Sequence, residues 1–251
     1  MTDRSRLLLP VISFALLSVV ALTVAGSLFY IRGKDIMEAQ LKEKLKSTAT
    51  AAAMQFEGET IEKITAESTM QNSPELEEIV LKLHKLRSEV INLRYAYIMR
   101  KTEDPAMHAF VADADLAATT AELDQNGNGM VDEEEEAATP GELYDWAEFP
   151  VLGNEAFIHP SVDEHIAEDQ WGPVISGYAP IRKTNGQVTA ILGIDMDANE
   201  YTLLSGSIFS PVALLLVLLA SISIAGGTVL AFWRRKIEEL ENLETERMGL
   251  L

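Results

Sequence analysis

The sequence predicts an α+β domain placed between two membrane-spanning helices. Three observations support this prediction: two long uncharged apolar runs, helical spacing of apolar residues after the first run, and period-two strand patterns that end in a hairpin. The chain has 251 residues, and the segment between the two runs is long enough to form one domain with its own core.

The net charge of −19 lies in this central segment, because residues 1–6 contribute +1 and residues 234–251 contribute −1. Such an acidic surface repels nucleic acid and favours cations or cationic ligands. The chain contains no cysteine, which excludes disulfides. It also lacks a phosphate loop, a zinc-protease motif and a hydrolase nucleophile elbow, so we expect no catalytic domain within it.

The first apolar run, residues 7–31, contains no charged residue and is long enough to cross a bilayer as a helix. A cleaved signal peptide is the alternative interpretation. Its apolar region is shorter, about 7–15 residues, and ends at a small-residue cleavage site. The run here passes directly into a further helical pattern, so we interpret it as an uncleaved anchor.

The second uncharged run, residues 208–233, is followed by Arg234, Arg235 and Lys236. Arg4 and Arg6 precede the first run, so basic residues flank the outer ends of both runs. The positive-inside rule therefore places both termini in the cytoplasm and the central domain outside it.

Between the runs, the pattern changes from helical to strand spacing. Apolar residues recur at helical spacing over residues 34–67, and Ser73-Pro74 predicts the start of a second helix. A long first helix continuous with a membrane span would suit the stalk of a homodimer. Period-two alternation then predicts strands at residues 95–99 and 107–113, followed by an acidic, loop-rich segment up to residue 170.

A β-hairpin organises the end of the central segment. Two apolar-rich runs, residues 174–181 and 188–194, are separated by a turn that ends in Asn185-Gly186. Asn-Gly between such runs is a strong hairpin signal, because both residues tolerate positive φ. Both faces of each run carry apolar side chains, which is typical of central strands.

The arrangement resembles the extracytoplasmic Cache (PDC, PAS-like) sensor domains of bacterial transmembrane receptors. The residues that carry the resemblance are Trp171-Gly-x-x-x-Ser-Gly-Tyr178-Ala-Pro-Ile and Ile191-Leu-Gly-Ile-Asp195. It implies a PAS-like, five-stranded antiparallel sheet with a long N-terminal helix on one face and a small ligand on the other. Residues 243–251 also resemble the lead-in to the dimerisation helix of sensor histidine kinases, although the phosphoacceptor motif does not follow.

We therefore divide the chain into a cytoplasmic N-terminus (1–6), a first span (7–31), a sensor domain (32–207), a second span (208–233) and a truncated cytoplasmic signalling helix (234–251). The expected function is a homodimeric, two-pass receptor of the bacterial inner membrane. It would sense a small ligand outside and signal to an output domain, a histidine kinase absent here. The alternative is a membrane-anchored calcium-binding interaction protein without signalling output.

Five residues are candidates for the ligand pocket. The resemblance implies ligand-facing positions for Trp171, Tyr178 and Asp195, whereas Tyr97 and Asp113 are placed by the strand pattern alone. The alternative is ordinary: strand aromatics belong to the core, and acids at strand ends are solvated. Aromatic walls with two acids would suit a small amine or an amino acid.

The segment Asp124-Gln-Asn-Gly-Asn-Gly-Met-Val-Asp-Glu-Glu-Glu135 matches the EF-hand calcium-loop pattern at every defined place. The alternative is a polar surface turn. The pattern predicts one structural Ca²⁺ site in which Gly129 makes the sharp turn. The oxygen ligands would come from Asp124, Asn126, Asn128, the Met130 carbonyl, Asp132 and a bidentate Glu135.

A second acidic and histidine-containing stretch contains His159, Asp163, His165 and Asp169. These residues would be suitable transition-metal ligands, but their spacing fits no helix face and Pro160 interrupts the stretch. We therefore interpret the histidines as surface residues.

Overall fold

The computed structural model describes residues 3–169 and 172–248, and the chain divides into two compact units. One unit is Glu38–Thr202, and the other combines Met1–Met37 with Leu203–Leu251. The first unit is an α+β domain, which confirms the predicted fold class. The helices of the chain are α1 (Asp3–Ala53), α2 (Gly58–Ile61), α3 (Pro74–Glu89), α4 (Thr120–Leu123), α5 (Pro150–Asn154) and α6 (Asn199–Met248), with 3₁₀ turns η1 (Ala114–Ala117) and η2 (Glu133–Glu135).

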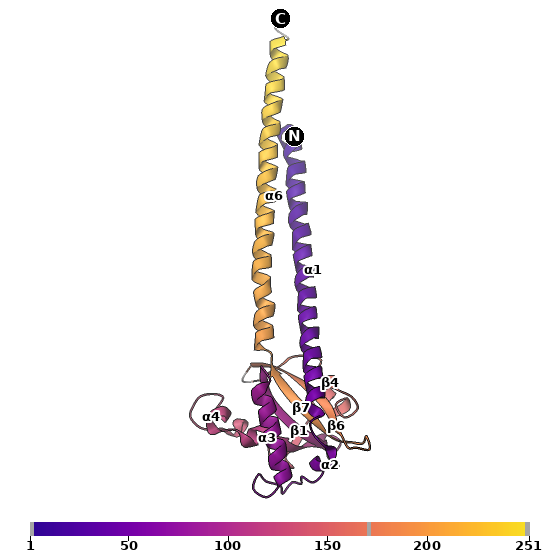
Figure 1. Cartoon of the computed structure of the whole chain (residues 1–251). Coiled ribbons are helices and arrows are strands. Elements are labelled where there is room, and N and C mark those ends of the chain that lie inside the picture. Colours follow the sequence, from indigo (N-terminus) through magenta and orange to yellow (C-terminus); the bar gives the residue numbers. More distant parts are fainter. Residues whose placement is uncertain (1–2, 170–171, 249–251) are drawn as a thin grey trace. The chain divides into compact units, whose positions relative to one another are not determined.

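The α+β domain is built on one antiparallel sheet (Figure 1). Its strand order is β3-β2-β1-β7-β6-β4, and β5 also pairs with β6. The last long strand, β7, therefore lies between β1 and β6, as its two apolar faces predict. The strands are β1 (Leu93–Lys101), β2 (Met107–Asp113), β3 (Leu143–Asp145), β4 (Ser161–Val162), β5 (Ala167–Asp169), β6 (Gly172–Arg182) and β7 (Val188–Asp197).

One face of the sheet packs against the end of α1 and against α3. Leu45 of α1 and Leu83 of α3 are fully buried there, together with Leu192 and Ile194 of β7. Helix α3 begins where Ser73-Pro74 predicts it, because the Ser73 hydroxyl accepts the Leu76 N–H at 3.3 Å as an N-cap. This face holds the larger of two apolar clusters in the domain.

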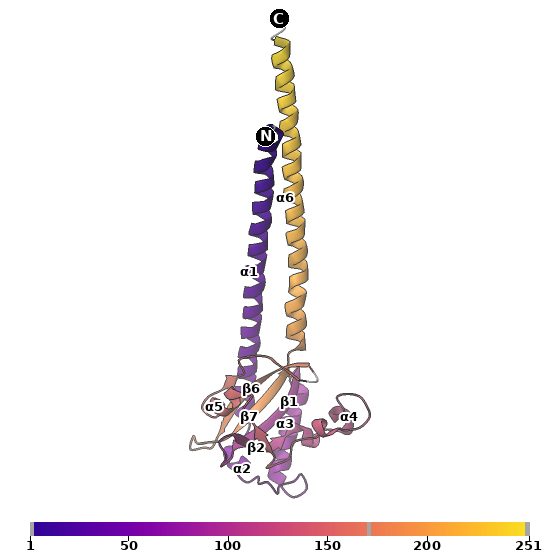
Figure 2. The same cartoon turned by 180° about the vertical axis from the view of Figure 1, so that it is seen from behind.

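The opposite face carries an aromatic cluster and is covered by α5 and its flanking segments (Figure 2). Met99, Tyr178 and Ile191 are buried in this cluster beside Val151 and Leu152 of α5. The rings of Tyr97, Phe110, Tyr144, Trp146, Phe149 and Phe157 pack around them. The predicted ligand face is therefore a real second face of the sheet, on the side away from α1.

The helix predicted over residues 34–67 is too long, because α1 ends at Ala53. The chain then makes turns and the short helix α2, although Phe56, Ile61 and Ile64 are still buried as the apolar pattern indicated. A Cβ on Gly58 would lie 2.8 Å from backbone atoms of Arg182 and Lys183. This close approach holds α2 against the β6–β7 turn, after the chain has left the path of α1.

The strand count of five implied by the resemblance is also wrong for this chain. The described residues form seven strands, and three of them, β3, β4 and β5, are two or three residues long. They lie within the acidic segment that we expected to be loop. Strands this short carry no period-two pattern, so pairing with the edges of β2 and β6 alone defines them.

The second unit consists of two long helical segments. Among the described residues, α1 and α6 each contain a stretch long and apolar enough to cross a membrane by length and composition. Large apolar side chains on them are exposed, including Phe14 (64%), Leu17 (71%) and Leu230 (68%). A Cβ on Gly26 would lie 2.2 Å from Leu216 Cδ1, so the two helices of this unit approach closely there.

The contact between α1 and the sheet gives a first prediction. A Cβ on Gly177 of β6 would lie 2.6 Å from Leu45 Cγ, so Gly177→Ala should overpack this interface. We expect a loss of about 1–3 kcal/mol in the free energy of unfolding, measured by denaturant unfolding of the purified chain. Leu45→Ala should relieve most of that loss in the double variant. Strictly additive effects would contradict the proposed contact.

Candidate ligand-binding site

The strand register places four of the five predicted pocket residues on the aromatic face. Asp113 of β2 pairs with Tyr97 of β1, Tyr97 pairs with Gly193 of β7, and Gly193 pairs with Tyr178 of β6. Directly opposite residues on neighbouring strands share a face, so this row lies on one side of the sheet. Asp195 lies two residues along β7 from Gly193 and therefore on the same side.

A glycine in the middle of this row makes room for a ring. A Cβ on Gly193 would lie 2.2 Å from Tyr97 Cε2 and 2.9 Å from its hydroxyl oxygen. The Tyr97 ring therefore lies directly over the β7 backbone. From there its hydroxyl donates a hydrogen bond to Asp195 Oδ1 at 3.2 Å.

A second acid completes a hydrogen-bonded network on this face. The Tyr178 hydroxyl donates to Asp163 Oδ2 at 3.2 Å, and both residues are buried. The Ser176 side chain forms hydrogen bonds with the carboxyl groups of Asp163 and Asp195. One serine hydroxyl has a single proton to donate, so it cannot satisfy two ionised carboxylates at once.

Burial makes ionisation of both acids unfavourable. It raises the pKa of Asp195 to about 7, and the nearby charges of Asp163 and Asp113 oppose ionisation further. It raises the pKa of Asp163 to about 6, against hydrogen bonds from Tyr178 and Ser176 that favour the charged form. The residue Asp195 keeps some exposed surface, but its carboxyl group is enclosed. The two acids thus form a site that a cation would stabilise.

The tyrosines in the network remain hydrogen-bond donors. Burial raises the pKa values of Tyr97 and Tyr178 far above the ordinary value, and the charges of Asp195 and Asp163 raise them further. Their hydroxyl groups therefore stay protonated throughout the physiological range. They can hold a carboxylate or a ligand acceptor, but they cannot act as bases.

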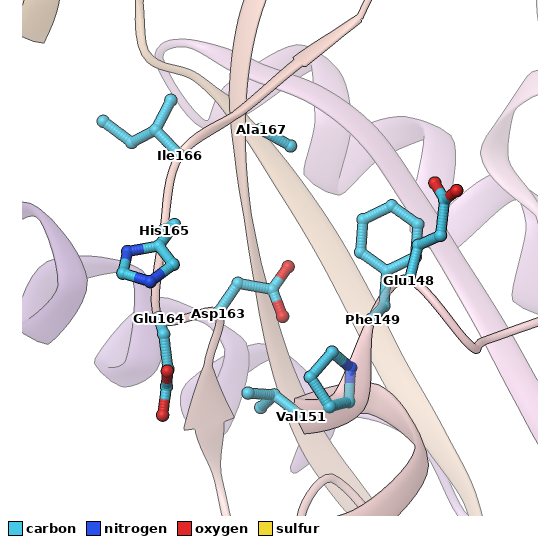
Figure 3. Close-up of a pocket in the computed structure, with 9 residues that line it drawn as sticks. Glu148, Phe149, Val151, Asp163, Glu164, His165, Ile166 and Ala167 are labelled. Carbon is cyan, nitrogen blue, oxygen red and sulfur yellow. The ribbon is translucent and has the colours of Figure 1, made fainter.

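Asp163 also lines a pocket of about 180 Å³ (Figure 3). One wall is formed by Phe149, Pro150 and Val151 at the start of α5, and the other by residues 163–167. In Figure 3 the Asp163 carboxylate points into the space in front of Phe149, while the side chains of Glu148 and Glu164 point away. The pocket thus gives access from the surface to Asp163, the one residue of the acid network that lines it.

The other two predicted pocket residues, Asp113 and Trp171, are not part of the described network. The Asp113 carboxylate accepts the N–H groups of Asp115 and Ala138, at 3.0 and 3.1 Å, and so ties down the segment after β2. Burial raises its pKa to about 7. Trp171 lies outside the described residues.

Two network residues were missed by the sequence-based prediction. Ser176 shares a face with Tyr178 by strand alternation, so this signal was available. Asp163 lies in the stretch considered for a metal site, where His159 and His165 are indeed exposed, but Asp163 itself is only 9% exposed. Its N–H bonds to the Ser176 carbonyl and continues the β4–β6 pairing, which no local pattern indicates.

The predicted calcium ligands lie elsewhere, in the segment that follows α4 and includes η2. Glu135 is buried, whereas Asp124 and Asp132 are partly exposed. Among the described residues, no three His, Cys, Asp or Glu side chains form a group that could hold a metal. Any site in the loop therefore depends also on the amide oxygens of Asn126 and Asn128 and on a main-chain carbonyl.

The buried acids predict an unusual pH dependence of stability. Their pKa values are higher in the folded than in the unfolded state, so the folded state binds more protons and the stability that these acids contribute falls as pH rises from about 4 to about 7. Asp195→Asn should flatten this fall by about 1–3 kcal/mol, whereas Asp104→Asn in an exposed turn should not. Thermal unfolding of the purified parent and variant chains across this pH range measures how stability depends on pH. Because the lowered pKa of His108 acts in the opposite direction, the comparison of the two chains decides: a stability difference between the parent and Asp195→Asn chains that stays constant from about pH 4 to 7 would contradict this prediction.

No protein-family model and no curated protein matches this chain. The structure is similar to the ligand-binding domain of the Campylobacter jejuni chemoreceptor Tlp3 in complex with 4-methylisoleucine, at 13% identity and a TM-score of 0.39, over 75% of this chain and 62% of that chain. The periplasmic sensory domain of the C. jejuni chemoreceptor Tlp1 matches at 10% identity and a TM-score of 0.28, over 65% and 63%. The chain thus spans less than two thirds of either neighbour. These likenesses are too low to assign a family or a ligand.

Proposed function

We propose that this chain is a membrane receptor whose domain Glu38–Thr202 binds a small cationic ligand outside the cytoplasm. The observation that carries the proposal is the enclosed network of Asp163, Ser176 and Asp195, held by Tyr97 and Tyr178 beside a surface pocket. The preferred ligand class is an amine or an amino acid.

The chemistry of the network favours a positive charge. Burying a carboxylate without a cationic partner is costly, and the network contains two. An ammonium group beside them would lower both pKa values and provide three hydrogen-bond donors. The faces of Phe149 and the neighbouring tyrosines would add cation–π attraction, worth about 0.5–2 kcal/mol in enclosed sites.

The chain path gives the site a route for output. Asp195 lies four residues before Asn199, where α6 begins. Asp197, between them, accepts the Asn199 N–H at 2.7 Å and pairs with Arg94 of β1 at 3.1 Å. A ligand that changes the position of β7 would therefore act on the residue that fixes the start of α6.

Membrane anchoring is supported by the exposed apolar surfaces of α1 and α6, which water would solvate poorly. We place both termini in the cytoplasm and the α+β domain outside the inner membrane. Helix α6 continues as a charged segment beyond the apolar run, which suits coupling to an output module such as a histidine kinase. A homodimer associated through α1 would be the signalling form. A calcium-binding anchor protein without output would give the enclosed acids no role.

Ligand binding is the direct test. The thermal unfolding temperature of the purified full chain should rise when at least one compound from a panel of amines and amino acids is added at pH 7.5. Asp195→Asn should weaken its affinity by about 10–100-fold, the cost of losing a buried charge partner. Asp104→Asn removes the same charge from an exposed turn and should leave the affinity unchanged. A ligand that stabilises the parent and Asp195→Asn chains equally would contradict this site.

The proposed topology can be tested with single cysteines, because the chain has none of its own. Asn185 in the β6–β7 turn and Asn242 in α6 are both exposed. An impermeant maleimide added to intact cells, with the outer membrane permeabilised, should label Asn185→Cys but not Asn242→Cys. Both should be labelled after lysis. The reverse pattern would place the α+β domain in the cytoplasm.

A further inference from the structure

We infer that the loop of residues 124–135 binds one Ca²⁺ ion, at a site separate from the acid network and independent of the proposed receptor function. The loop follows α4 and includes η2. In Figure 1, α4 and this segment lie to the side of the sheet, next to α3. The function proposed above makes no use of this segment.

The spacing of oxygen donors is the first argument. Side-chain oxygens occur at the first, third, fifth, ninth and twelfth places, in Asp124, Asn126, Asn128, Asp132 and Glu135. The main-chain carbonyl of Met130 supplies the seventh place. The sixth place requires a sharp turn, and Gly129 there has φ +87°, a conformation that few other residues adopt.

The loop side chains converge on its interior. Asp132 Oδ2 accepts the side-chain amides of Asn126 and Asn128, at 2.7 and 2.8 Å. A half-turn of either amide would direct its oxygen to the same carboxylate. These oxygens would repel one another unless a cation lay among them. The side chains are therefore close together, but to bind an ion the two amide oxygens must turn from the Asn128 and Met130 N–H groups, which they accept at 2.9 and 2.8 Å.

Glu135 closes the loop from its other end. Its Oε1 accepts the N–H groups of Gln125 and Asn126, both at 3.0 Å, and its Oε2 accepts the Asp132 N–H at 3.1 Å. The residue is only 3% exposed. This carboxylate therefore lies inside the loop, at the place where the twelfth residue of a calcium loop binds the ion with both oxygens.

Uncompensated charge is an independent argument. Residues 102–181 contain 19 Asp and Glu residues but no Lys or Arg. Among the described side chains, none of Asp124, Asp132 and Glu135 forms an ion pair. A buried carboxylate without a cationic partner is costly. Main-chain N–H groups satisfy the hydrogen bonding of Glu135 but leave the net negative charge of the three carboxylates uncancelled, so a cation from solution would stabilise the loop.

The donor set selects calcium. All the donors are oxygens of carboxylates, amides or a carbonyl, which suits hard cations rather than transition metals. Calcium accepts six to eight oxygens with flexible geometry, whereas magnesium requires a strict octahedron. A single loop without a paired partner should bind calcium with a Kd of about 10⁻⁴–10⁻³ M, the range of extracellular modules.

The site is attached to the sheet at both ends of its segment. The Gln125 side chain and the Tyr95 hydroxyl of β1 lie within hydrogen-bonding distance, at 3.0–3.1 Å. The Ala138 N–H donates to Asp113 at the end of β2. Calcium that orders the loop should therefore also stabilise the α+β domain.

Isothermal titration of the purified, chelator-treated full chain tests the site. In a titration with CaCl₂, the parent should bind one Ca²⁺ ion per chain with a Kd of about 10⁻⁴–10⁻³ M. In a titration with MgCl₂, Mg²⁺ should bind at least tenfold more weakly. Glu135→Gln should weaken calcium binding at least tenfold. Glu136→Gln removes the same charge from the next, exposed residue and should change the Kd less than twofold.

Asp124→Asn provides a second variant in case Glu135→Gln fails to fold. It should also weaken binding at least tenfold, and thermal unfolding with and without calcium reports whether each variant folds. The inference is overturned if the parent shows no saturable calcium binding. It is equally overturned if Glu136→Gln weakens binding as much as the ligand variants do, because the acidic segment would then attract cations only by its overall charge.

Discussion

The burial of β7 on both faces is the constraint on which the rest of the structure depends. Residues 190, 192, 194 and 196 face the α1 and α3 side, and Gly193 and Asp195 face the aromatic side. A slip of one residue in a strand exchanges its two faces. It would place Asp195 against Leu45 and Leu83, and aliphatic residues in the acid network. The turn at Asn185-Gly186, with Gly186 at φ +85°, fixes the register and so keeps both faces correct.

The acid network is stable only because its surroundings partly compensate for its cost. Hydrogen bonds from Tyr97, Tyr178 and Ser176 favour the ionised acids, but their pKa values still remain raised. Lys42 of α1 lowers the pKa of Asp163 slightly, yet its ammonium group is paired with Glu38 and with the Glu164 carbonyl. The protein therefore leaves part of the charge compensation to protons or to a ligand. Such incomplete compensation is typical of functional sites rather than of structural cores.

The sequence was sufficient to predict the features that local chemistry specifies. The Ser73-Pro74 cap, the strands β1 and β2 and the β6–β7 hairpin all depend on residues within a few positions, and the structure confirms them. The position of α2 and the three short strands depend instead on contacts with distant backbone, such as Gly58 against residues 182–183. Asp163 was missed as a pocket residue for the same reason. Only its pairing with Ser176, thirteen residues later in the chain, buries it.

The loop of residues 124–135 and the acid network are attached to the same pair of strands, β1 and β7. Tyr95 of β1 pairs with Asp195 of β7 in the sheet register, and its hydroxyl bonds to Gln125 at the start of the loop. The neighbouring Arg94 pairs with Asp197, which fixes the first residue of α6. The loop, the acid network and the start of α6 are thus all attached to residues 94–97 of β1 and residues 195–197 of β7, which pair with each other in one β1–β7 ladder. If calcium changes the position of this ladder, the affinities for calcium and for the ligand must change each other by the same factor, since the coupling free energy is reciprocal. A contact at Tyr95 that lies outside the pocket would then regulate the receptor without touching its ligand.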